Sequence, residues 1–129
     1  MKEKADLERY LLELGQPYEE IADGIYMVND EVDNVDNIII MWAPPLVVFR
    51  VKLLDLGTGD HSQLLRRLLE LNATEMVAGA YGLEGEAVVV VDSLQSENLD
   101  YNEFRASIDS LVMAITVHYP MLKRAMAVQ

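Results

Sequence analysis

The stretch MVAGAYGLEGEAVVVVD, residues 76–92, decides the fold of this chain. It contains two β-prone runs, residues 76–83 and 86–92, which are joined at Glu84-Gly85. Because glycine tolerates the positive φ that a tight hairpin needs, the two runs predict a pair of antiparallel strands. The valines at 88–91 offer apolar side chains to both faces of the sheet, so we expect something to cover the second face.

Three further strands are predicted upstream of this hairpin. Residues 25–28 and 38–42 are β-prone and are separated by a polar turn, which is the pattern of another antiparallel hairpin. Residues 46–54 follow Pro44-Pro45 and alternate in polarity. This alternation predicts a strand with apolar residues on one face and Arg50 and Lys52 on the other.

Helical periodicity predicts three helices, at residues 4–14, about 60–72 and about 100–120. Asp60 with Gln63, and Asp100 with Glu103, have the spacing of a capping box and are expected to start the second and third helices. Pro120 is expected to end the third helix, because proline lacks the backbone N–H that a helix interior requires.

The expected order is therefore α-β-β-β-α-β-β-α, an α+β fold in which an antiparallel sheet is packed by helices. Connections are short and no linker or low-complexity tract interrupts the chain, so residues 1–129 are expected to form a single domain. Five strands make a sheet about 24 Å wide, and helices are about 10 to 12 Å across. Two helices then cover one face, and the third covers only part of the other.

Charge and composition exclude several classes of partner. The formal net charge is −12, which repels nucleic acid and anionic membrane surfaces. The longest uncharged stretch, residues 110–122, is too short for a membrane span, and residues 1–10 mix both charges without an apolar region typical of a secretory signal. We therefore expect a cytoplasmic protein. The absence of cysteine excludes disulfides and thiol chemistry.

No motif predicts catalysis, a metal site or a cofactor. The turn at residues 57–60 has neither the glycine pattern nor the lysine of a phosphate loop, and the acidic cluster at residues 30–36 lacks the glycine and closing glutamate of an EF-hand. His61 and His118 have no neighbouring ligand at metal spacing. His61 is expected to face solvent. His118 is expected to be a satisfied, partly buried side chain on the apolar stripe of the last helix.

The apolar residues beyond those that one core needs are the most informative feature of the sequence about function. In the last helix Met113 and Val117 lie nearly opposite the main apolar stripe, so that half of the helix is apolar all round. Together with Leu65, Leu68 and Leu69 of the second helix, they are predicted to form a dimer or partner interface. The alternative is a twisted sheet wrapped by the first helix, with scattered exposed apolar residues.

The helix LLRRLLELN (residues 64–72), the strand Tyr81-Gly82-Leu83 and the closing helix from Phe104 to Tyr119-Pro120 together resemble the YbjN family, which is similar in fold to class I type III secretion chaperones. The resemblance covers about residues 23–122. It implies a small, acidic, usually dimeric cytoplasmic protein that binds polypeptide or acts in regulation, with no catalytic residues.

Two functional hypotheses follow. The first is a non-enzymatic homodimer that binds a partner protein through its sheet face and its second helix. The second is a regulatory module that binds a small molecule between the last helix and the sheet, near Trp42, Tyr81 and His118. An enzyme is the third alternative, and no local acid, base or nucleophile motif supports it.

Overall fold

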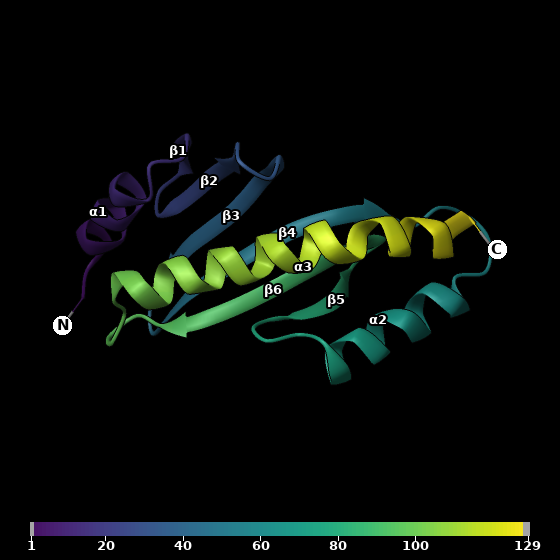
Figure 1. The fold of residues 1–129 in the computed structure, drawn as a ribbon. Coiled ribbons are helices and arrows are strands. Elements are labelled where there is room, and N and C mark those ends of the chain that lie inside the picture. Colours follow the sequence, from purple (N-terminus) through teal and green to yellow (C-terminus); the bar gives the residue numbers. More distant parts are fainter. Residues whose placement is uncertain (1, 128–129) are drawn as a thin grey trace.

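The computed structural model describes residues 2–127 and contains one six-stranded antiparallel sheet with three helices (Figure 1). The strand order across the sheet is β1-β2-β3-β4-β6-β5. In chain order the elements are α1 (Lys4–Leu14), β1 (Tyr18–Ala22), β2 (Ile25–Asp30), β3 (Val35–Ala43), β4 (Leu46–Asp55), α2 (Ser62–Thr74), β5 (Ala80–Glu84), β6 (Ala87–Gln95) and α3 (Tyr101–Ala127). The predicted α+β class and the antiparallel pairing are confirmed.

The sequence-based order missed one strand, β1. It is a five-residue edge strand that pairs with β2, with Tyr18 opposite Val28. Four of its five residues are exposed, so it lacks the apolar alternation by which a half-buried strand is found in a sequence. Its pairing with β2, rather than its own composition, makes it a strand.

Of the two predicted helix starts, one needs correction. The Asp60–Gln63 capping box does not form: His61 is the N-cap of α2, and the Asp60 carboxylate accepts a hydrogen bond from the Ser62 backbone N–H at 2.9 Å. At α3 the Asp100 carboxylate does accept from the Glu103 N–H, at 2.8 Å.

The third helix does not stop at Pro120 but continues to Ala127. A proline in a helix interior costs about 3 kcal/mol relative to alanine. Tertiary packing offsets this cost, because Leu122 is fully buried and Ala125 and Met126 pack against the core.

All three helices pack against the same face of the sheet. Residues directly opposite one another on neighbouring strands share a face, and the core residues Tyr26, Ile40 and Phe49 stand in one such row. Tyr10 of α1 and Phe49 of β4 both contact the ring of Phe104 in α3, with centroids 5.9 and 5.8 Å away. Figure 1 shows α3 lying over β4 and β6, with α1 near its start and α2 beside its second half. The expectation that one helix partly covers the second face is therefore wrong.

The β5 edge of the sheet is closed by α2. The carboxamide of Asn72 accepts a hydrogen bond from the Tyr81 backbone N–H at 2.7 Å and donates one to the Tyr81 carbonyl at 3.0 Å. These are the backbone groups that an edge strand otherwise leaves unpaired. On the opposite edge, β1 pairs with β2 alone.

Candidate functional surface

The face of the sheet that carries no helix is the first candidate surface. Its side chains stand in cross-strand rows, of which the outermost contains Ala43, Leu46 and Gln95 and three lie further in. One row runs from β2 to β6 through Ile25, Met41, Val48 and Ser93. The second crosses all six strands through Glu19, Met27, Ile39, Arg50, Val91 and Ala80. The third contains Lys52, Val89 and Gly82.

The large apolar members of the three inner rows form a continuous strip over the four central strands, here called the open sheet strip: Ile25, Met27, Ile39, Met41, Val48, Val89 and Val91. None of them belongs to the core cluster or packs against it. All are half-buried except Val89, which is 3% exposed although it lies outside the core. Their burial therefore comes from neighbours on the same face.

Two basic side chains stand within this apolar strip. Arg50 forms an ion pair with Glu84, and Lys52 forms one with Asp55 at 2.9 Å. Arg50 Nε is buried and has no hydrogen-bond partner within residues 2–127. A buried N–H without a partner costs about 1 to 3 kcal/mol.

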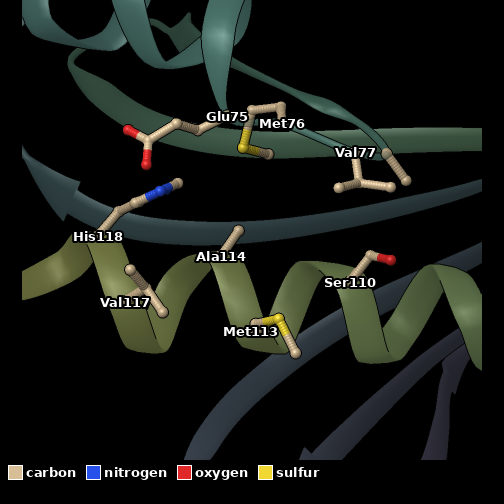
Figure 2. A pocket seen from close by; sticks show the side chains of 9 residues that line it. Glu75, Met76, Val77, Ser110, Met113, Ala114, Val117 and His118 are labelled. Carbon is tan, nitrogen blue, oxygen red and sulfur yellow. The ribbon is translucent and has the colours of Figure 1, made fainter.

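A second candidate surface is a hollow of about 240 Å³ beside α3 (Figure 2). Met113, Ala114 and Val117 of α3 form one wall, and the segment that follows α2 forms the other, with Met76 and Val77 (Figure 2). Met113 and Val117 are 68% and 59% exposed, and Val77 is 94% exposed. The hollow is therefore an apolar depression that is open to solvent.

A buried hydrogen bond closes one end of this hollow. His118 is 4% exposed, and its Nδ1 lies 2.7 Å from the Tyr81 hydroxyl. The Glu75 carboxylate lies above the His118 ring in Figure 2. Burial raises the pKa of Tyr81 to about 12, and the negative charge of Glu75 adds to the effect. His118 was expected to be a satisfied, partly buried histidine; it has the expected partner and is buried more deeply than expected.

The predicted interface residues occupy different environments. Leu69 is 70% exposed on α2, and Leu65 is half-buried against the core. Leu68 is a core residue, so its side chain is unavailable to a partner of the folded protein. Met113 and Val117 face solvent on α3.

The residues predicted to share a ligand pocket do not all meet. Tyr81 and His118 are in contact, but Trp42 lines a different hollow near the N-terminus, with Pro44, Pro45 and Ser96. A sheet face is predicted from the sequence as a binding surface, but the individual residues of the open sheet strip are not. The signal was present in the alternate positions of residues 38–42 and 88–91, which are apolar toward both faces.

His61 departs from its expected solvent exposure. It is half-buried, and its Nε2 lies 2.7 Å from the Gly57 carbonyl oxygen.

In the acidic turn, one oxygen of Asp30 accepts hydrogen bonds from the backbone N–H groups of Val32 and Asp33, so this carboxylate stabilises the turn itself. Within residues 2–127, no three His, Asp or Glu side chains are grouped to hold a metal ion. None of the helices in this part of the chain is long and apolar enough to cross a membrane.

Comparison with known proteins places this architecture in a known group. The CesT_Tir_1 family model matches residues 1–127. Among curated proteins no match was found. Solved structures with a similar fold include a chain of the heterodimeric ExoU-SpcU complex from the type III secretion system of Pseudomonas aeruginosa, with a TM-score of 0.73 and 13% identity over 92% of this chain and 98% of that chain.

Two further structures have the same fold. YbjN from E. coli, described as a putative transcription regulator, has a TM-score of 0.68 and 17% identity over 94% of this chain and 96% of that chain. A chain of the Yersinia pestis type III secretion chaperone SycH in complex with a fragment of YscM2 has a TM-score of 0.63 and 17% identity over 88% and 97%. At these identities the likeness shows the fold.

Proposed function

Because this chain belongs to the CesT_Tir_1 family, we propose that it is a cytoplasmic, non-enzymatic protein-interaction module that binds a partner polypeptide on the open sheet strip in a chaperone-like manner. The observation that carries this proposal is the placement of all three helices on one face of the sheet, which leaves an apolar strip over four strands without cover. Most of the strip is partly accessible to solvent, and contiguous apolar surface that solvent reaches marks interaction sites.

Structures of similar fold support a polypeptide partner. Solved structures of the same fold include chaperone complexes with polypeptide partners, among them HopA1-SchA and SycH with YscM2. Small-molecule binding has less support, since Trp42 lies apart from Tyr81 and His118.

Self-association is part of the proposal. The exposed Leu69 and the half-buried Leu65 lie one turn apart on α2 and form an apolar edge beside the core. We assign the homodimer contact to this edge of α2. Size-exclusion chromatography with light scattering tests it: Leu69→Asp is expected to convert a dimer to a folded monomer, and a wild-type monomer at tens of micromolar contradicts the assignment.

The test of partner binding is affinity capture with a matched pair of variants. Val48→Asp places a charge in the open sheet strip, and Leu12→Asp places the same charge on the exposed side of α1, away from the strip. Proteins captured from the source lysate by the wild type are expected to be lost with Val48→Asp and retained with Leu12→Asp. Equal capture by all three folded proteins contradicts the proposed surface.

A further inference from the structure

The solvent-facing ridge of α3 lies between two hollows. The ridge consists of Met113 and Val117, which are one helical turn apart and line both hollows. On one side is the hollow of about 240 Å³ that Met76 and Val77 complete. On the other side Asp33, Asp109 and Thr116 complete a second hollow. A chain crossing this ridge therefore meets apolar side chains at its centre.

Carboxylates border the ridge on both sides. Glu75 lines the first hollow, and Asp33 and Asp109 line the second. Asp109 is 3.5 Å from Arg105, whereas Glu75 and Asp33 form no ion pair within the part of the chain that the structure describes. Within this described part, neither hollow is lined by lysine or arginine. The electrostatic field around the ridge is therefore negative, which favours a basic partner.

The negative charge of Glu75 is unfavourable at its position at the end of α2. It is the C-cap of α2, where the helix dipole favours a cation, and the last turn of α2 carries no basic residue. Its charge also lies close enough to the Tyr81 hydroxyl to help raise the pKa of that group. A carboxylate at this position does not stabilise α2, and it presents its charge at the rim of the hollow.

From this geometry we propose that the Met113–Val117 hollow is a specificity site that receives one apolar side chain of a partner polypeptide flanked by a lysine or arginine that pairs with Glu75. This inference rests on the proposed polypeptide-binding function and adds a second contact to it. An apolar cavity of about 150 Å³ accommodates benzene, so a hollow of about 240 Å³ has room for a leucine, methionine or phenylalanine side chain.

The test is selection of random dodecapeptides displayed on phage against the immobilised full-length protein. We expect the selected peptides to share an apolar residue beside Lys or Arg. Fluorescence polarisation of the selected peptides then measures affinity for the wild type and for folded variants. Val117→Asp is expected to weaken binding by about tenfold or more. Glu75→Lys is expected to lower the affinity for basic peptides about three- to tenfold. The same variant is expected to bind more tightly the versions of these peptides in which the lysine is replaced by glutamate.

Matched controls separate local effects from general ones. Glu97→Lys makes the same charge change in the exposed segment before α3, and Ile21→Asp places a charge on exposed β1; both are expected to leave peptide affinity unchanged. Peptides without a basic residue, or peptides indifferent to Val117→Asp and Glu75→Lys, overturn this inference.

Failure of the inference is distinguishable from failure of the proposed function. Selected peptides that respond to Val48→Asp and not to Val117→Asp support the sheet surface and refute the hollow. If no peptides are selected and Val117→Asp changes the oligomeric state, the occupant is a second copy of this chain and the inference is wrong. If no peptides are selected and the oligomeric state is unchanged, the hollow takes no polypeptide and the inference is likewise wrong, while capture with Val48→Asp still decides the sheet surface.

Discussion

Two adjacent residues of β3 provide a direct test of which sheet face is open. Ile39 points to the open sheet strip and is half-buried, whereas Ile40 points to the helices and is 0% exposed. We compare Ile39→Ala with Ile40→Ala, because the chemical change is identical and the strand position differs by one residue. The two variants therefore differ mainly in which face of the sheet loses its side chain.

The expected magnitudes differ. Ile40→Ala removes buried carbons and leaves a cavity, which costs about 2 to 5 kcal/mol of the free energy of unfolding. Ile39→Ala removes three carbons that are partly accessible to solvent and leaves an open gap. At about 0.8 kcal/mol per buried methylene, this change costs about 1.5 to 2 kcal/mol. Partner capture is expected to show the opposite order, with the larger loss for Ile39→Ala.

Urea denaturation followed by the fluorescence of Trp42, the single tryptophan, measures both stabilities. The midpoint is expected to fall markedly for Ile40→Ala and less for Ile39→Ala, with an unchanged slope. Equal destabilisation of several kcal/mol by both substitutions refutes the open face, because it requires Ile39 to be sealed in a second core. Unimpaired capture by Ile39→Ala argues against the strip as the binding surface.

Three further predictions concern the region around β5. Gly79→Ala is expected to lower the free energy of unfolding by about 2 kcal/mol or more, because φ is +76° and the new Cβ meets the Val91 carbonyl oxygen at 2.8 Å. Gly57→Ala, whose Cβ meets nothing within 4 Å, is the control and is expected to be neutral or stabilising in urea denaturation. Asn72→Ala leaves the Tyr81 N–H and carbonyl without their partner, so we expect a loss of about 1 to 3 kcal/mol and faster hydrogen exchange of the Tyr81 amide; an unchanged exchange rate contradicts the edge-closing role. Because the folded-state pKa of Tyr81 is raised to about 12, the protonated hydroxyl contributes stability that is present below about pH 10 and lost as the pH rises toward 12. The wild type is expected to lose about 1 to 2 kcal/mol more than Tyr81→Phe across this window, after allowance for solvent screening, and parallel pH profiles of the two proteins would refute it.

Local sequence patterns predicted most of the elements of the fold. The first helix, residues 4–14, was predicted at its observed bounds. The predicted hairpin between β5 and β6 forms, with its two-residue turn at Gly85-Glu86, one residue later than the predicted Glu84-Gly85. These features depend on short-range periodicity and on glycine's backbone freedom. The errors at β1 and Pro120 have a different origin, because in both places a distant segment overrides the local preference.

The sequence predicted that apolar side chains on the helices form a surface, but it did not distinguish the exposed ones from those in the core. Met113 and Val117 were placed on an exposed side of the last helix from their angular position, and the structure agrees. Leu68 and Leu69 have the same chemistry and adjacent positions, yet one is a core residue and the other is exposed. Periodicity gives the angle between two side chains but not the direction in which the core lies.

The amino-acid sequence by itself determined that this chain has more apolar side chains on its strands than a one-sided sheet needs, together with an acidic surface and no local catalytic motif. These are properties of residue type and spacing. Only the tertiary structure decided that α1, α2 and α3 all lie on one face, so that the second face stays open. The physical reason is that a strand with apolar residues on both sides accepts a helix equally well on either face. The connections and the long-range packing of Tyr10, Phe49 and Phe104 select the face, and these contacts join residues far apart in the sequence.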